Sequence, residues 1–512
     1  MAKANKYKKL ISNSIIFAIG NLTVKVAQFF LLPILTLYFS ANDYGVSTTL
    51  ADIVETITPL LTLGIAEGLF RFAVDGSHKN EELLSSGIMV VACGCAVFAV
   101  GDLIIYAMYP QSYIIWLIPL FIIRSFKKLL AEFIRGMGKT VIYSLSGIIE
   151  AITLIGPAAL FLLVLDMGIT GYVFALMVSA FIALIFFILV CKPHKYVKFS
   201  AIKKKKLKAM ILYSLPSVPN MLSWWIVQLS AQYVIIWFVG MDEKGLFTAA
   251  SKIPALINVI SNIFLQAWSI SSAEECEDET RNKFYSQIYR YYRVIISYAV
   301  CLVVVATPFI SRFLLQDEFY NAWTYSPVLI VTVGMGGCIS AFFGAFFGAF
   351  YKPYLGTITT LMGAVVNIVL SVSLVPFIGA YGAIIANASG YVVIAVSRIL
   401  YSRKLVKLEI GHTKTAISFV LLMLQAVVYM FNLKYKIISG AVVFVLLALL
   451  YFKDIKGLVK VMISMLKGKK IKAQSLAPAQ NTIETPVQAV EEACVQTAEE
   501  KTETAETLDK TE

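Results

Sequence analysis

Three cations lie inside long apolar runs of the chain, where a charged side chain normally has a function. They are Lys25, Arg124 and Lys252. A lysine or arginine at membrane depth is costly unless it faces water, a partner or a ligand. In a water-poor cleft such cations bind phosphate far more strongly than in bulk water. We therefore predict that they attract an anion such as a pyrophosphate. For Lys252 the alternative is a side chain that extends to the polar turn predicted at 241–245.

Three carboxylates in the same apolar runs could bind a proton or Na⁺. Asp52 and Glu55 lie three positions apart, so on a helix they share a face. Glu150 lies inside a later run. A carboxylate in a transporter cavity can couple transport to an ion gradient, and we predict coupling or gating for these three residues. The alternative is that Lys25, Asp52 and Glu55 satisfy one another as a buried network.

Two further groups of charges lie nearer to the ends of their apolar runs. Glu67 and Arg71 have i,i+4 spacing, which predicts an ion pair on one helix. Arg124 begins a stripe of charges that either lines the cavity or only anchors its helix at the membrane surface. The other members of that stripe are Lys128, Glu132 and Arg135.

The composition is that of an all-α integral membrane protein. The chain has 512 residues, of which 59% are hydrophobic and only 15% charged, and its mean hydropathy is +0.78. Soluble domains carry about 25% charged residues. Apolar runs long enough to span a bilayer recur along the chain, and no cleavable signal peptide is apparent. About fourteen transmembrane helices are predicted: 11–39, 45–72, 85–109, 113–136, 140–166, 169–191, 209–240, 245–272, 293–315, 325–351, 355–378, 380–402, 415–432 and 435–452.

The basic residues predict the orientation of these helices. They gather in the connections on one side, most densely in the run Lys203 to Lys206. Cytoplasmic loops carry an excess of lysine and arginine, so both termini are expected in the cytoplasm. The net charge of +13 is explained by this topology and does not indicate nucleic-acid binding.

The two halves of the chain look like repeats of one another. Residues 35–53 align without gaps on 235–253, so that Gly45 matches Gly245 and Asp52 falls opposite Lys252. A weaker match sets 165–172 against 376–383. Transporter folds often contain such repeats, with the substrate site at their interface. The pattern predicts two six-helix lobes around a central cavity, plus a terminal helix pair.

The predicted divisions of the chain follow from these helices and from two changes of composition near the C-terminus. The Lys-rich segment there has apolar residues at helical spacing, which is typical of an amphipathic helix on an anionic membrane surface. The polar tail that follows is expected to be disordered. The divisions are an N-terminal lobe at 1–191, a basic hinge at 192–208, a C-terminal lobe at 209–407, the terminal pair at 408–452, the amphipathic segment at 453–472 and the acidic tail at 473–512.

The sequence contains no recognisable enzymatic constellation. Its three histidines, His78, His194 and His412, share no motif, and no phosphate-binding loop or metal-ligand spacing is present. We therefore predict a protein that is not an enzyme and holds no metal or cofactor. The predicted outer loops are too short to carry the catalytic arginine or histidine of a polysaccharide polymerase or ligase. A gradient or the membrane potential would have to drive transport.

Several stretches resemble the polysaccharide transporter family, the oligosaccharide flippases of O-antigen, capsule and teichoic-acid export. They are LLTLGIAEGLFRFAVDG (60–76), FIRGMGK (133–139), NMLSWWIV (220–227) and the segment at 245–275. The resemblance covers roughly 5–450, and its more specific parts are the AxKIP, FxQAW and WW segments. The family belongs to the superfamily that also holds multidrug extruders and lipid II flippases. The Asp-Arg pair that often follows WW in the family is Ala231 and Gln232 here.

The resemblance implies transport of an undecaprenyl-pyrophosphate-linked oligosaccharide from the inner to the outer leaflet of a bacterial cytoplasmic membrane, by alternating access. It places Lys252 at the basic position of AxKIP and Arg71 at the LFRF position, both toward the pyrophosphate. Trp224 and Trp225 would contact sugar faces, or would have only a packing or interfacial role. The expected partners are the lipid-linked oligosaccharide, membrane lipids and other polysaccharide-assembly proteins. If the protein were a scaffold, its acidic tail would recruit those assembly proteins. The alternative on this fold is a cation-coupled multidrug exporter.

Overall fold

The computed structural model describes residues 29–466 apart from 76–78, 275–278, 351, 353, 407, 409 and 410. In that part of the chain, every regular element is a helix. Eight helices are long and apolar enough to cross a membrane, and the number is eleven if each bent helix pair counts as one span. The protein is therefore a multi-pass, all-α membrane protein, as predicted. The predicted number of fourteen spans stays a prediction, because most of the first span precedes residue 29.

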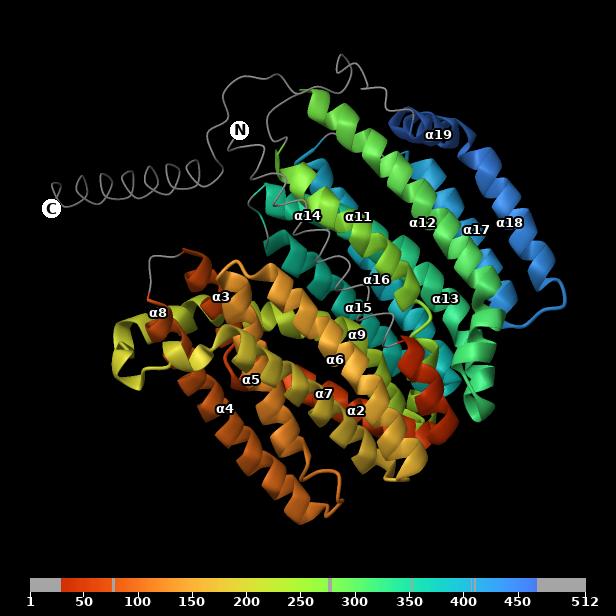
Figure 1. The fold of residues 1–512 in the computed structure, drawn as a ribbon. Coiled ribbons are helices and arrows are strands. Elements are labelled where there is room, and N and C mark those ends of the chain that lie inside the picture. The colour runs from red at the N-terminus through yellow and green to blue at the C-terminus, as the bar shows by residue number, and fades with distance from the viewer. Residues whose placement is uncertain are drawn as a thin grey trace, which may run out of the picture. The chain divides into compact units, whose positions relative to one another are not determined.

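The first half of the chain forms one set of packed helices. The helix Phe29–Tyr38 comes first. It is followed by α2 (Ala41–Leu61), α3 (Ile65–Asp75), α4 (Asn80–Met108), α5 (Leu117–Gly136), α6 (Thr140–Ala159), which continues into η1 (Leu160–Val164), and α7 (Gly168–Cys191). Helices α3, α4 and α5 pack on one another, and α7 packs along both α5 and α6. Figure 1 shows α3 to α7 in orange and yellow as one group.

A short, lysine-rich connection leads to the second half. It contains the turns η2 (Pro193–Tyr196) and η3 (Phe199–Ala201) and the helix α8 (Lys204–Ser214). The connection is tied to the beginning of α4, where Glu82 forms ion pairs with Lys203 and Lys206 at 2.9 and 2.5 Å. Lys198 pairs with the neighbouring Glu81 at 2.5 Å. The segment predicted as a hinge is thus held by ion pairs to the first half of the chain.

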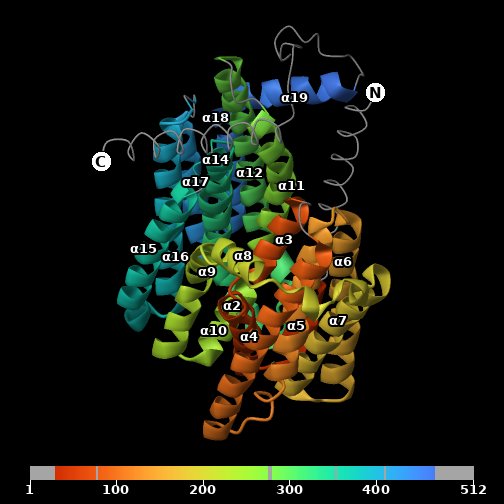
Figure 2. The same ribbon diagram turned by 90° about the vertical axis from the view of Figure 1, so that its left-hand side faces the viewer.

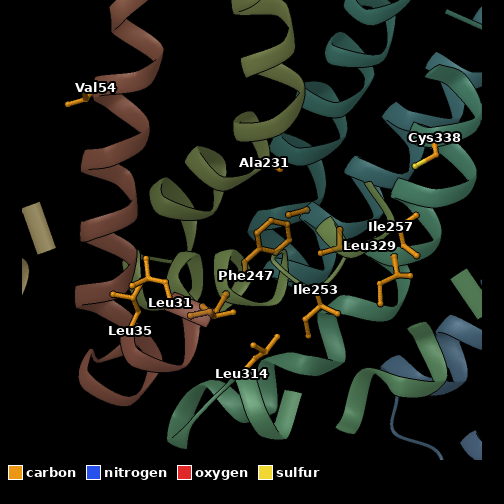
Figure 3. Close-up of a cluster of buried hydrophobic side chains, with 14 of the residues drawn as sticks. Leu31, Leu35, Val54, Ala231, Phe247, Ile253, Ile257, Leu314, Leu329 and Cys338 are labelled. Carbon is orange, nitrogen blue, oxygen red and sulfur yellow. The ribbon is translucent and has the colours of Figure 1, made fainter. Parts of the chain in front are cut away.

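The second half forms a second set of helices, shown in green to blue in Figure 1. Its members are α9 (Ser217–Phe238), α10 (Met241–Ala250), α11 (Ala255–Glu274), α12 (Glu279–Leu314), η4 (Asp317–Tyr325), α13 (Ser326–Val331), η5 (Thr332–Cys338), α14 (Ile339–Ala349), α15 (Tyr354–Ile378) and α16 (Ala380–Arg403). Helices α15 and α16 lie along one another, and α9 packs on both. Phe247, Ile253 and Ile257 lie in the same buried cluster as Leu329 of α13 (Figure 3).

The terminal pair consists of α17 (His412–Met430) and α18 (Lys436–Leu450), and α19 (Phe452–Leu466) follows. Both α17 and α18 pack on α12. The Arg293 side chain of α12 is almost completely buried and reaches the Asp454 carboxylate at 3.5 Å. It also donates to the Gly411 carbonyl at 3.1 Å. This arginine therefore joins both ends of the terminal pair to the second half of the chain.

The weaker of the two repeat matches has a structural counterpart. Gly168 and Gly379, which the sequence alignment pairs, each begin a helix and each have φ of +58°. An L side chain rarely adopts that conformation, so glycine is favoured at both turns. The repeat match therefore sets a positive-φ glycine at the first position of α7 opposite one directly before α16.

Candidate functional site

The two halves meet most closely where α2 crosses α10, and Figure 2 shows these helices beside one another. The crossing is formed by Gly45 and Gly245, the pair that the repeat alignment predicts. A Cβ atom on Gly245 would overlap the Ala41 carbonyl oxygen, and one on Gly45 would overlap the Met241 carbonyl oxygen. Ala41 and Met241 are also matched in the repeat. The contact is thus approximately symmetric, and it needs glycine on both helices because backbone meets backbone.

Lys244 reaches across this crossing. Its side chain is almost completely buried, and its Nζ donates to the Gly45 carbonyl at 3.1 Å and to the Thr48 hydroxyl at 2.5 Å. The same Nζ lies 3.8 Å from the Asp52 carboxylate. The prediction of a polar turn at 241–245 is wrong, since these residues form the first part of α10. The contacts of Lys244 make it part of the interface between the halves.

Asp52 is the centre of a mixed group of charges. It lies eleven positions into α2, which is about 16 Å along a helix that rises 1.5 Å per residue. About a quarter (27%) of its side chain is exposed. The charged side chains near its carboxylate are Lys244, Lys252, Glu55 and Arg124. We call these five residues the central charge cluster; it combines two carboxylates with three cations.

Three of the predicted site residues belong to this cluster together with Asp52. Lys252 is exposed and lies in the break between α10 and α11, next to the buried Ile253. Glu55 is exposed one turn beyond Asp52, and Arg124 is half-buried on α5. A broken helix at membrane depth is tolerated where its backbone lines a cavity, which suits a site beside Lys252. The cluster is able to attract an anion through its cations and a proton or metal cation through its carboxylates.

The structure does not bring the other predicted residues to the cluster. Glu150 pairs with Lys127 of α5 at 2.5 Å, inside the first half of the chain. Arg71 is exposed on α3 and is not among the charges that act on Asp52. Among the residues that the structure describes, Glu67 and Arg71 form no ion pair, so that predicted pair is wrong. Arg135 instead pairs with Glu132 at 2.9 Å and covers the Phe70 ring at 4.0 Å.

Two predicted residues cannot be placed. Lys25 precedes the described part of the chain, and the side chain of Trp224 also lies outside it. Trp225 follows the 44° bend between Lys204–Ser223 and Trp225–Phe238, and its side chain is half-buried. The sugar contact by Trp224 and Trp225 stays a prediction. The network of Lys25 with Asp52 and Glu55 is likewise untested, although Asp52 already has Lys244 as a cationic partner.

The main residue that sequence reasoning missed is Lys244. A usable signal was present, because the gapless repeat sets Lys244 opposite Tyr44, and both side chains are 1% exposed. The position is therefore an interface position in both repeats. The polar residues Asp242-Glu243-Lys244 are typical of a turn. Composition therefore predicted a turn here, although the repeat aligns these residues with the segment at 42–44.

The turn η4 covers the end of the bundle where α2 and α10 begin. Glu318 accepts a hydrogen bond from the Ala41 backbone N–H, where its charge suits the N-terminus of α2. Tyr325 donates its hydroxyl to Glu243 of α10 at 2.6 Å. The Phe319 ring meets Tyr44 edge to face, with 5.5 Å between the ring centroids. This turn thus holds the beginnings of both repeat helices together.

The model of a family described as "Polysaccharide biosynthesis protein" matches residues 10–270, which is just over half of the chain and includes α2 to α10. The chain belongs to this polysaccharide biosynthesis protein family. The match contains every member of the central charge cluster. Among curated proteins, none matches the chain.

The fold of this family member is that of the MOP transporter superfamily. An inward-facing multidrug resistance MATE family transporter matches with a TM-score of 0.60 at 17% identity, over 76% of this chain and 97% of the other. A MOP superfamily transporter from Pyrococcus furiosus, described as having a binding pocket of reverse polarity, has a TM-score of 0.58 at 16% identity, over 77% of this chain and 94% of the other. The outward-facing MATE transporter has a TM-score of 0.54 at 17% identity, over 77% and 94%. The chain thus combines a polysaccharide biosynthesis family domain with a fold that is found in membrane transporters.

Proposed function

We propose that this protein moves an undecaprenyl-pyrophosphate-linked oligosaccharide from the inner to the outer leaflet of a bacterial cytoplasmic membrane. The observation that carries the proposal is the central charge cluster of a polysaccharide biosynthesis family member. Three cations, Arg124, Lys244 and Lys252, act there on one carboxylate. A pyrophosphate is the most strongly charged part of such a lipid, and cations in a water-poor site bind phosphate oxygens well.

The proposed mechanism is alternating access between the two halves. The contact of Gly45 with Gly245 supports it, because a backbone contact without side chains can open and close as a unit. Helices α2 and α3 together form one bent span. At the end of that span away from the Gly45 contact, Gly68 of α3 packs against Ser214 of α8. The half-exposed Trp225 would meet the sugar, as would Trp224. Lys25 and Arg71 would add to the attraction of the pyrophosphate. Asp52 and Glu55 would bind the coupling proton or Na⁺, but not Glu150, which is already paired with Lys127.

The asymmetry of basic residues supports the proposed orientation. In this orientation the α2–α10 crossing would lie at the outer side and both termini in the cytoplasm. The expected contacts of the protein are its lipid-linked substrate, the surrounding lipids and other polysaccharide-assembly proteins, without nucleic acid.

A cation-coupled multidrug exporter is the second candidate. It is favoured by the MATE relatives on the same fold and by Asp52 and Glu55, which would attract an organic cation. Against it stand the three cations of the cluster, which would repel such a substrate.

The experiment compares cells that lack this protein with cells that carry the wild type or Lys252→Ala. Lipids are extracted, and undecaprenyl-linked oligosaccharide and surface polysaccharide are quantified. The proposal predicts accumulated lipid-linked units and lost surface polymer, restored by the wild type but not by Lys252→Ala. Cells without accumulation but with new sensitivity to cationic drugs would support the exporter instead. Full rescue by Lys252→Ala would remove this lysine from the site.

A further inference from the structure

The buried cation of the central charge cluster is also part of the contact between the repeats. Lys244 belongs to α10, whereas all three groups around its Nζ belong to α2: the Gly45 carbonyl, the Thr48 hydroxyl and the Asp52 carboxylate. When α2 and α10 separate, this ammonium group loses all three at once. A cation that is only 1% exposed is stable only while such partners surround it.

Asp52 differs from the other two partners because its charge can change. The Gly45 carbonyl and the Thr48 hydroxyl are neutral under all conditions, but a carboxylate can be neutralised by a proton, a bound metal cation or a substitution. Asp52 is also the partner that is partly exposed, at 27%. A proton or a metal cation can therefore reach the Asp52 carboxylate, whereas the Lys244 side chain is enclosed in the contact.

We propose that Lys244 and Asp52 form a latch, which keeps the α2–α10 crossing closed while Asp52 is charged and releases it when Asp52 is neutral. Neutralisation removes the only negative group at the Lys244 ammonium among the described residues. The remaining acceptors are two dipoles, which compensate a buried charge less well than a carboxylate does. Lys244 is in this account a positioning residue that couples the state of the site to the closure.

Other groups around Asp52 modulate the latch. Lys252 and Arg124 are cations near Asp52, and Glu55 is a second carboxylate near it. Three tyrosines also lie near Asp52; they are Tyr44 on α2, Tyr172 on α7 and Tyr233 on α9. An anion bound between Lys252 and Arg124 would reduce their effect on Asp52. In terms of the proposed function, which this inference deepens, substrate binding would thereby weaken the latch.

Closure can be measured without any substrate. The Asn42 amide donates to the Asp242 carboxylate at 3.4 Å across the crossing, and both side chains are exposed. The reporter is the full chain with Asn42→Cys and Asp242→Cys, reconstituted in liposomes and treated with a short thiol cross-linker. Chains with only one of the two substitutions report any reaction of the native cysteines. The rate of cross-linking then follows the fraction of molecules with a closed crossing.

The variants are placed in this reporter chain. Asp52→Asn and Lys244→Met are each expected to lower the cross-linking rate roughly tenfold, and the double variant no further than either single one, because each removes the same interaction. Asp52→Glu keeps the charge and should retain the rate within about twofold. Glu150→Gln is the matched control: it removes a carboxylate paired with Lys127 inside one half, and should leave the rate unchanged.

The latch is overturned if Asp52→Asn cross-links as fast as Glu150→Gln. It is also overturned if the fold-decrease in cross-linking rate of the double variant equals the product of the two single fold-decreases. The two residues would then act independently. Asp52 is partly exposed and asparagine has its shape, so this test survives a folding defect of Lys244→Met. Because no substrate is present, the latch can fail while the proposed flippase stands, and it can hold in a protein that transports something else.

Discussion

Gly45 and Gly245 face each other at matching positions of the two repeats. The Cβ atom of either residue, if present, would lie 3.2–3.3 Å from the backbone nitrogen of the other, and would overlap a carbonyl oxygen besides. The symmetry of the contact means that each half closes on the other with the same surface. It also places Lys244 and Asp52 beside the point where the halves touch.

Alanine at either glycine should hold this crossing open. Gly45→Ala and Gly245→Ala each add a methyl group where a carbonyl oxygen already lies, and overpacking of this kind typically costs about 1–3 kcal/mol. The expected result is slower cross-linking between Asn42→Cys and Asp242→Cys. Gly101→Ala on α4 is the control, because its added methyl group meets nothing within 4 Å. Equal cross-linking rates in all three variants would show that the backbone contact does not limit closure.

Loss of Arg293 should detach the terminal helix pair. Its guanidinium is buried and contacts Asp454, the Gly411 carbonyl and the Thr415 hydroxyl. Arg293→Met leaves Asp454 without its buried partner, and such a loss typically costs about 3–5 kcal/mol. The apparent melting temperature of the detergent-solubilised protein should fall clearly. Lys414→Met removes the more exposed partner of the same carboxylate, 38% exposed, and should cost no more than about 1 kcal/mol. If the two variants melt alike, Arg293 is not the anchor.

Glu82 should determine how firmly the connection before α8 is held. Glu82→Gln removes the shared partner of Lys203 and Lys206 at once. Trypsin should then cleave this connection faster in the folded protein, because release of the lysines exposes the backbone around them. Glu81→Gln is the control, since it removes the single, more exposed pair with Lys198. Unchanged cleavage in Glu82→Gln would mean that the connection is held by packing alone.

The tryptophan of the FxQAW segment should act through packing. Trp268 is buried, stacks on Phe342 with 4.4 Å between centroids and donates its indole N–H to the Phe342 carbonyl at 3.2 Å. Trp268→Ala should cost about 3–5 kcal/mol of stability. Trp237→Ala truncates a side chain that is 77% exposed and should have a small effect. Melting temperatures of the two variants distinguish the positions; a Trp268 variant as stable as the Trp237 variant would show that packing at Trp268 contributes little to stability.

The apolar periodicity and the repeat predicted much of this fold. Long apolar runs are sufficient evidence for membrane helices, because a lipid-exposed backbone must satisfy its own hydrogen bonds. The alignment of Gly45 with Gly245 also carried spatial information, since repeats that pack about an approximate two-fold axis place equal positions in contact. The match of 165–172 with 376–383 pairs two glycines that both have positive φ, Gly168 and Gly379.

The partners of individual charges were not predictable in the same way. Glu67 and Arg71 have the spacing of a pair but do not meet, because spacing on one helix says nothing of what the neighbouring helices offer. Lys127 was overlooked, although it is the partner of Glu150 across α5 and α6. Lys244 was placed in a loop because its neighbours are polar, whereas its burial depends on α2, which lies far away in the sequence.

The most direct test of the account is translocation by the purified protein. Liposomes are loaded with a polyprenyl-pyrophosphate oligosaccharide in the inner leaflet, and a lectin added outside captures the sugars that appear there. The account predicts fast capture with the wild type, and capture at the rate of protein-free liposomes with the paired variant Lys252→Gln and Arg124→Gln. Wild-type liposomes that behave like protein-free ones in every imposed gradient, or a paired variant as active as the wild type, would contradict the claim that the central charge cluster carries an anionic lipid-linked sugar across the membrane.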